Sequence, residues 1–444
     1  MRRKNQDTAR SRMRPKAAIA PASKDRANRL RLVVCIAIFI AGLVRWAPPY
    51  RAQFDEVRMY ESGDESLRVA YSLAHGYGFA NPFKTVESGP TAHLAPVFPF
   101  LLSIIVRWIG DGSRALYVVD WMGVSAASLQ VCLWPYLARR LRMGFAAGAI
   151  AAVLWLICGL APNTIWDADY LAVLVILVSM GTLKVLSGGC SAPFIAAVGA
   201  LWGITILAGP VVLIPFAILA GWTIFFSSAS RRQKILFVVL PMLVLAPWTI
   251  RNYRTFHHIF LVRDNLGLEL GVFNNECAEF SFAANQDNGC YFHPNEDAKE
   301  AQRLLNLGEY DYYQKRLQEA LQWISSSPGK FGFLTFQRFI AFWFPNGSGN
   351  PFTSSVHNNV KVLWLLTLFS VPGLLFLWWT DRRSAIFCLV WLLFFPPVYY
   401  LVGFDLRYRT PIIWATMIPA SFVLLQAGSQ LIRRAEPYPA TTST

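Results

Sequence analysis

The chain has 444 residues, of which 55% are hydrophobic and 14% aromatic, and it carries a formal net charge of +15. Soluble domains are about 45–50% apolar, and the excess here is gathered in long runs such as 32–44 and 235–248. Runs approaching about 20 apolar residues predict transmembrane helices, because the bilayer core is roughly 30 Å thick. The composition therefore excludes a soluble protein and predicts an all-α, polytopic membrane protein.

The basic charge is concentrated before the first apolar run. Residues 1–31 are rich in Arg and Lys and contain only Asp7 and Asp25 as acids. A basic tail in front of a span marks the cytoplasmic side and is attracted to anionic lipid. The expected partner of this charge is therefore membrane lipid and not a nucleic acid. No small-residue cleavage site follows the run, so Leu32–Ala47 is expected to stay as an anchor.

Short basic loops, which mark the cytoplasmic side, set the expected topology. They occur at 139–142, 231–234, 382–383 and 433–434. With the N-terminus inside, about ten spans return each of these loops to the cytoplasm: 32–47, 115–137, 145–162, 169–186, 193–208, 210–227, 235–250, 359–379, 385–402 and 411–430. The resulting parts are a cytoplasmic tail, a transmembrane bundle, a large external loop, C-terminal transmembrane helices and a second cytoplasmic tail, at 1–31, 32–250, 251–357, 358–430 and 431–444.

The apolar run 97–110 does not fit this pattern as a span. It is short and contains Pro99 and Arg107, so we expect a helix that lies at the outer surface. The segments 48–96 and 251–357 then both lie outside and hold all six histidines. Transporters usually carry ionisable groups near the midplane of the bilayer. The placement of the polar groups therefore favours chemistry at the membrane surface.

The second external segment contains two expected helices and a pair of cysteines. Helical spacing of apolar side chains predicts an amphipathic helix over 309–324, and the aromatic-rich stretch 331–345 is expected to lie in the membrane interface. Cys277 and Cys290 lie in a polar stretch of the same segment. Outside the cytoplasm they form either a disulfide or two unpaired thiols.

Asp64 and Glu65 stand at the start of a short expected helix in the first external segment. Apolar residues on one side of 67–74 predict that the helix packs on the protein, and Gly76 and Gly78 end it. Acids in an external loop are often only solvated surface. A helix start beside the membrane is an ordered site that favours anions, so one of these two carboxylates could act as a general base.

The surrounding residues resemble a known family. GDESLRVAYSLAHGYGFANPF (63–83) followed by ESGPTAHLAPVFPFLLSIIVRWIG (87–110) is similar to the first external loop of bacterial GT-C glycosyltransferases. These are relatives of the protein O-mannosyltransferases and lipid A aminoarabinose transferases, a group resembling glycosyltransferase family 39. Further similar stretches are APWTIRNYRTF (246–256), FQRFIAFWFP (336–345) and DLRYRTPII (405–413). The likeness runs from about Leu32 to Arg434.

The resemblance implies an inverting membrane glycosyltransferase. Such enzymes move a sugar from a polyprenyl-phosphate donor to an acceptor hydroxyl on the outer face of the membrane, which in a bacterium is the periplasmic face of the inner membrane. The base that takes the hydroxyl proton would be Asp64 or Glu65. The lipid A branch has a lysine before a Pro-Pro pair in this loop, whereas this chain has His93-Leu94-Ala95-Pro96. The sugar is left open, and so is the acceptor, which could be a glycan, a lipid or a protein.

Arginine suits the leaving lipid phosphate, because its planar guanidinium can bind two oxygens. Arg407 and Arg409, at the outer end of the last span, are the first candidates to hold the donor phosphate, and Arg251 and Arg338 lie at a similar expected depth. Tyr408 and His93 are expected to bind substrate. A divalent cation could share the phosphate's charge, but no tight histidine spacing marks ligands for it, so no cofactor is assigned.

Three other functions remain open at this point. A lipid or oligosaccharide transporter, or flippase, would carry polar groups deep in its spans. A non-catalytic scaffold would tolerate neutralisation of Asp64 and Glu65. An O-antigen ligase or polymerase would rely on basic residues and histidines of a large external loop rather than on an acid pair.

Overall fold

The computed structural model describes residues 21–48, 60–61, 64–159, 161–345 and 356–435. Most of the N-terminal tail, the C-terminal residues 436–444 and parts of both external segments therefore lie outside the described residues. The described part consists of helices joined by turns and irregular loops, with two isolated β-bridges. This confirms the expected all-α class.

Each of the ten expected spans is a helix. They are α1 (Pro21–Arg45), α4 (Ser113–Arg140), α5 (Phe145–Cys158), α6 (Ala168–Ser187), α7 (Ala192–Ala208), α8 (Leu213–Phe226), α9 (Arg231–Phe256), α15 (Val356–Thr380), α16 (Arg382–Phe394) and α18 (Trp414–Ala435). The first of them begins inside the basic tail, because Lys and Arg are good helix formers.

The spans differ in length. Among the described residues, six helices are long and apolar enough to cross a membrane, and a bent pair of η3 (Leu406–Ile412) with α18 brings the number to seven. Three of the expected spans, α5, α7 and α8, are shorter apolar helices. At about 1.5 Å per residue, a 14-residue helix such as α5 reaches only about 21 Å. Gly159 and Pro162 explain the early end of α5, since neither favours a continuing helix.

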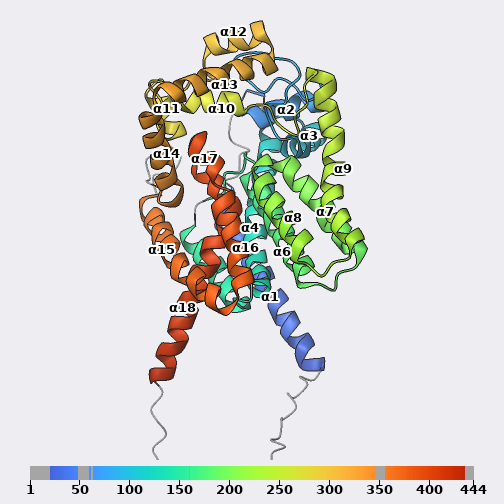
Figure 1. Ribbon diagram of the computed structural model, residues 1–444, viewed down its shortest axis with the longest axis vertical. Helices are drawn as coiled ribbons and strands as arrows, with labels where there is room; N and C mark the ends of the chain where they lie inside the picture. Colours follow the sequence, from blue (N-terminus) through green and yellow to red (C-terminus); the bar gives the residue numbers. More distant parts are fainter. Residues whose placement is uncertain (1–20, 49–59, 62–63, 160, 346–355, 436–444) are drawn as a thin grey trace, which may run out of the picture.

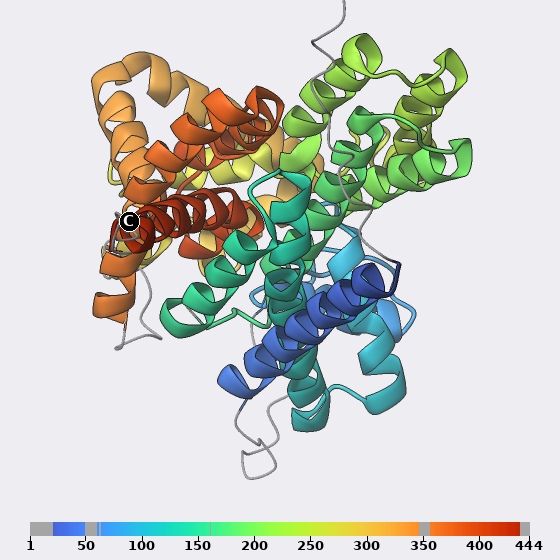
Figure 2. The ribbon, with the colours of Figure 1, turned by 90° about the horizontal axis from the view of Figure 1, so that it is seen from below.

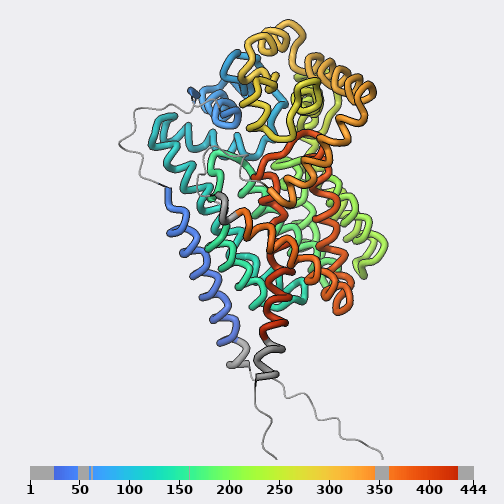
Figure 3. The backbone as a smooth tube through the Cα atoms, turned by 90° about the vertical axis from the view of Figure 1, so that its left-hand side faces the viewer, coloured from blue at the N-terminus to red at the C-terminus, as the bar shows by residue number. Residues whose placement is uncertain are grey.

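The helices form an elongated bundle with a cap at one end (Figure 1). The cap contains helices of both external segments, and α1 and α18 reach furthest at the opposite end, where the described chain starts and stops (Figures 1 and 3). Seen from below, α1 runs alongside α4, and α18 runs beside α5 and α15 (Figure 2). Large buried tryptophans fill the bundle, among them Trp202 and Trp391, whose rings stack with centroids 5.9 Å apart.

The cap is built from short helices. The first external segment supplies α2 (Glu65–Ala74) and α3 (Val97–Ile109), and the second supplies α10 (Leu266–Phe273), α11 (Phe282–Asp287), α12 (Ala298–Leu307), α13 (Glu309–Ser326) and α14 (Pro328–Trp343). The expected helices over 309–324 and 331–345 are thus present as α13 and α14. A disulfide joins Cys277 to Cys290, with their Cα atoms 5.8 Å apart.

The short apolar helix α3 lies beside α2 in the cap, as the expected surface helix would. Its 13 residues reach about 20 Å, too short to cross the bilayer core. Phe98 and Leu102 pack against Leu67 and Ala70 of α2, whereas Trp108 is 82% exposed. The apolar side of α2 is therefore covered by α3, which fixes where its first residues point.

Candidate active site

Asp64 caps the N-terminus of α2. Its carboxylate accepts hydrogen bonds from the backbone N–H groups of Ser66, at 2.9 Å, and Leu67, at 3.1 Å. The side chain is buried, and this burial raises the pKa of Asp64 to about 7, although the two N–H donors and the charge of Arg407 act to lower it. A carboxylate with a pKa near neutrality can accept a proton far better than an ordinary aspartate.

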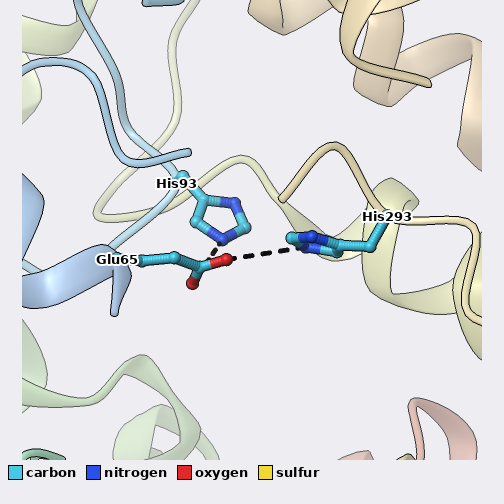
Figure 4. A group of neighbouring side chains, drawn as sticks. All are labelled: Glu65, His93 and His293. Atoms are coloured by element: carbon cyan, nitrogen blue, oxygen red, sulfur yellow. Dashed lines mark hydrogen bonds and ion pairs between the residues drawn. The ribbon is translucent and has the colours of Figure 1, made fainter. Parts of the chain in front are cut away.

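Glu65 lies between two histidines from distant parts of the chain (Figure 4). One oxygen lies 3.1 Å from Nε2 of His93, and the other lies 3.8 Å from Nε2 of His293. Burial on its own would raise the pKa of Glu65, but His93, His293 and Arg263 outweigh it and lower this pKa to about 2. The adjacent acids therefore differ: Glu65 stays ionised at neutral pH, whereas Asp64 is near its titration point.

Both ring nitrogens of His93 lie close to a partner, Nε2 to Glu65 and Nδ1 to Tyr313. Its Nδ1 lies 3.0 Å from the hydroxyl of Tyr313, and its backbone carbonyl accepts from Nε of Arg263 at 2.7 Å. The side chain is only 1% exposed, so the structure places it as a partner of Glu65. Direct binding of substrate by His93 stays a prediction.

A second group of buried acids lies behind His93. Glu309 accepts from the backbone N–H of Ala92 at 2.5 Å, and its pKa is raised well above the usual value by burial and by the negative charge of Asp264. Burial likewise raises the pKa of Asp264 to about 6. Glu309 and Tyr313 stand one turn apart on α13, so one face of this helix holds both Ala92 and His93 in place.

The contact between α10 and α13 depends on Gly267. A Cβ atom at this position would overlap the carbonyl oxygen of Tyr313, which is backbone and cannot move aside alone. Gly267→Ala is therefore expected to lower the free energy of unfolding by about 1–3 kcal/mol, as overpacking does. The measurement is the thermal unfolding midpoint of the detergent-solubilised protein. Gly329→Ala is the control, because its Cβ would meet nothing within 4 Å, and equal midpoints for the two variants would refute this expectation.

Among the four expected phosphate ligands, Arg407 is the one whose charge lowers the pKa of Asp64. It also acts to lower the pKa of the half-buried Glu269, which burial raises. Its guanidinium carbon lies 3.5 Å from the centre of the Trp166 ring, and its Nε lies 3.9 Å from a carboxylate oxygen of Asp405. The expected substrate residue Tyr408, next in sequence, stacks on Tyr399.

A cavity of about 70 Å³ opens beside Arg407. Its lining includes Asn163 and Asp169 from the region where α6 begins, and Asp405, Arg407 and Arg409 from the region of η3. The cavity therefore brings the guanidinium groups of Arg407 and Arg409 close to the polar side chains of Asn163 and Asp169.

The other three expected phosphate ligands bind the protein itself. Arg409 donates to the carbonyl of Trp343 and to Thr367, and Arg338, which is 0% exposed, donates to Asn274 and to the carbonyls of Phe273 and Leu401. Arg251 donates to the carbonyls of Phe79 and Thr91. These contacts occupy terminal N–H groups of the three guanidinium groups and tie the external loops to the helices. A phosphate contact of these three residues stays a prediction.

Several residues of the site had no local signal in the sequence. His293, Tyr313, Arg263 and Glu269 come together with the first external segment only through folding, because 170 to 220 residues separate His93 from its partners Arg263 and Tyr313. The sequence shows no tight histidine spacing for a metal, yet Glu65, His93 and His293 place one ligand atom each within 4.8 Å of one another.

Solved structures match the chain over nearly its whole length. The apo crystal structure of the Archaeoglobus fulgidus oligosaccharyltransferase gives a TM-score of 0.53 at 16% identity, covering 91% of this chain and 51% of that one. AglB, the archaeal oligosaccharyltransferase from Archaeoglobus fulgidus in complex with an inhibitory peptide and a dolichol-phosphate, gives 0.51 at 15% identity, covering 94% and 53%. The chain therefore spans about half the length of these structures.

ArnT from Cupriavidus metallidurans, bound to undecaprenyl phosphate, is similar over 95% of this chain and 82% of that one, at 12% identity. Its TM-score of 0.34 is too low to bear on the fold. No protein-family profile and no curated protein sequence matches the chain. The likeness to the oligosaccharyltransferases concerns the fold alone: the chain shares its fold with these structures, in agreement with the resemblance to GT-C glycosyltransferases seen in the first external loop.

Proposed function

We propose that the chain is an inverting membrane glycosyltransferase that moves a sugar from a polyprenyl-phosphate donor to an acceptor hydroxyl on the outer face of the membrane. The observation that carries this proposal is the buried carboxyl of Asp64 at the start of α2, whose pKa is raised to about 7 by burial and lowered in part by the charge of Arg407 from the far end of the chain. One group can take a proton, and the other can stabilise a leaving phosphate.

Asp64 is the better candidate for the base, and Glu65 for a positioning group. A general base works best when its pKa lies near the operating pH. Asp64 meets that condition, whereas Glu65 is bonded to His93 and its pKa lies near 2. In the proposed step the acceptor oxygen attacks the anomeric carbon while Asp64 takes its proton, and the bond from that carbon to the phosphate oxygen breaks. A single displacement inverts the anomeric centre.

Arg407 is the group proposed to meet the lipid phosphate. The negative charge that develops on the leaving phosphate needs a preorganised cation in a site shielded from water. Arg407 is half-buried between the Trp166 ring and Asp405, and it lines the cavity described above. The AglB structure contains a dolichol-phosphate, a lipid phosphate of the same chemical class. The basic-loop topology puts the proposed site on the outer face of the membrane. The family resemblance implies a bacterial source, for which this is the periplasmic face of the inner membrane.

The test is release and transfer of sugar from radiolabelled polyprenyl-phosphate sugars by the purified protein in lipid vesicles. Turnover by the unmodified protein, and none by the double variant Asp64→Asn with Glu65→Gln, is the expected result. The alternative is a lipid or oligosaccharide transporter, and its signature would be label that crosses the vesicle membrane with the sugar still attached. That result, with equal rates in the double variant, would overturn the proposal.

The pH dependence of transfer follows from the pKa of Asp64. The base must be ionised to act, so kcat/KM is expected to rise with pH through an apparent pKa near 7 and to fall about tenfold per pH unit well below it. The negative charge of Glu65 raises the pKa of Asp64. Glu65→Gln should therefore move the rising limb to lower pH.

The control for this pH profile is Asp311→Asn, which removes an exposed acid of α13 and should leave the limb in place. A profile that stays flat between pH 5 and pH 8, in a range where the unmodified protein remains folded, would contradict the assignment of Asp64 as the base.

A further inference from the structure

We propose that the disulfide between Cys277 and Cys290 is a redox-sensitive positioning device for the site. When it is closed, it holds the segment 277–290, which contains α11, against both halves of the site. When a dithiol reductant opens it, the segment is released and transfer falls. The two cysteines are 13 residues apart in sequence, and their Cα atoms are 5.8 Å apart. The loss of transfer rests on the proposed function, whereas the change in structure does not.

On one side the segment 277–290 contacts the chain that leads to Arg407. Just before α11 it forms an isolated parallel β-bridge with Phe404. The N–H of Phe404 donates to the carbonyl of Phe280 at 3.4 Å, and the N–H of Phe282 donates to the carbonyl of Phe404 at 3.5 Å. Asp405 follows directly, and its carboxylate accepts the backbone N–H of Arg407 at 2.9 Å. The disulfide-closed segment therefore fixes the backbone next to the proposed phosphate ligand.

On the other side the segment 277–290 supports a histidine that lies beside Glu65. Directly after Cys290, the ring of Tyr291 stacks on the ring of His293, with centroids 5.2 Å apart. Phe282 of α11 meets the same Tyr291 ring edge to face, with centroids 4.7 Å apart. Nε2 of His293 then lies 3.8 Å from a carboxylate oxygen of Glu65 (Figure 4). One short segment thus contacts the groups on both sides of the site.

The segment 277–290 contains little regular structure of its own. Its helix α11 has six residues, fewer than an isolated helix needs to be stable. Inside the segment, the buried Asn285 donates to the carbonyls of Glu279 and Ser281 and accepts the N–H of Glu279. A crosslink limits the conformations that are open to such a loop. Opening the disulfide therefore frees the segment to leave Phe404 and Tyr291.

The disulfide is accessible to a reductant at one of its two sulfurs. Cys277 is exposed, whereas Cys290 is only 6% exposed. A thiolate of a dithiol attacks Sγ of Cys277, and Cys290 leaves as a thiolate. The second thiol of the reductant then displaces Cys277, which closes the reductant to a cyclic disulfide. The dithiol gives up two electrons and two protons, and both cysteines become thiols. The other five cysteines are free thiols, so the reductant has no bond to break at them.

The experiment compares the unmodified protein in lipid vesicles before and after dithiothreitol, with alkylation and mass spectrometry to count the opened disulfides. Reduction is expected to raise KM for the polyprenyl-phosphate sugar about tenfold or more, because the phosphate ligand is no longer preorganised, and reoxidation should restore it. Hydrogen exchange of the Phe282 and Phe404 amides should become about tenfold faster or more. The double variant Cys277→Ser with Cys290→Ser should show both changes without reductant and no response to it.

The matched control is Cys158→Ser with Cys190→Ser, which removes two half-buried free thiols and should keep the full response to the reductant. A response that persists in the variant without the disulfide would overturn the proposal, and so would unchanged exchange of the two amides in protein shown to be reduced. If that variant fails to fold, reduction and reoxidation of the unmodified protein decide. Faster exchange with no transfer by any form would leave the positioning device standing and remove the enzyme. Transfer with unchanged exchange would do the reverse.

Discussion

Asp64→Asn is expected to reduce glycosyl transfer by about 10²- to 10⁴-fold, the range that a positioned general base contributes. The substitution is nearly isosteric, and Asn is as good an N-cap as Asp, so the hydrogen bonds to the N–H groups of Ser66 and Leu67 are retained. What is lost is the group that can take a proton. The measurement is kcat/KM for sugar transfer from a radiolabelled polyprenyl-phosphate sugar in vesicles.

Asp64→Ser separates the capping role from the chemical one. Serine caps a helix but has no carboxylate, so it should fold like the unmodified protein and be as inactive as the Asn variant. If either variant transfers sugar at more than a tenth of the unmodified rate, Asp64 is not the base, and the role returns to Glu65.

Arg407→Ala is expected to lower kcat/KM by about 10²- to 10³-fold, the loss seen when one preorganised donor to a developing charge is removed. Arg407→Lys should lose less, because it keeps the charge but not the planar fork. A second effect has a definite sign. Arg407 lowers the pKa of Asp64, so the Ala variant should show its rising pH limb at higher pH. The measurement is the pH profile of transfer at fixed donor concentration.

The matched control is Arg107→Ala, which removes an exposed arginine of α3 in the same cap. It should transfer at the unmodified rate with an unshifted limb. An Arg407→Ala variant that behaves like this control would remove Arg407 from the site and leave the lipid phosphate without an assigned cation.

The acid pair could be predicted from the sequence because its signals are local. A polar residue that can cap, apolar positions at helical spacing and two glycines place Asp64 and Glu65 at a helix start, and the structure has α2 there. Helix ends are decided within a few residues of chain. For the same reason the helices expected over 309–324 and 331–345 are present in the structure, as α13 and α14.

The partners of these acids could not be predicted in that way. Nothing near His293 in the sequence indicates that it will face Glu65, because the contact is created by packing of the two external segments. The arginines could be located in the sequence as candidates, but the groups that their side chains contact could not be predicted from it. Arg338 and Arg409 lie in basic-aromatic stretches like Arg407, but only the fold shows that their guanidinium groups are taken up by carbonyls and hydroxyls.

The number of bilayer crossings does not follow from the apolar runs alone, for a physical reason. An apolar run records that a segment avoids water, and it does not record whether the helix reaches both faces of the bilayer. The short helices α5, α7 and α8 are as apolar as the longer ones, but they end at glycine, proline or serine positions before spanning length is reached.

The contacts of α13 with Ala92 and His93 affect the order in which the site can form during synthesis. Glu65 meets His93 across 28 residues, but His93 meets Tyr313 across 220. Ribosomes add about 5–20 residues per second, so at least about ten seconds pass between synthesis of the histidine and synthesis of the tyrosine that orients it. We therefore expect His93 to gain its Tyr313 contact, and the first external segment to reach its folded form, only after most of the second external segment has been synthesised.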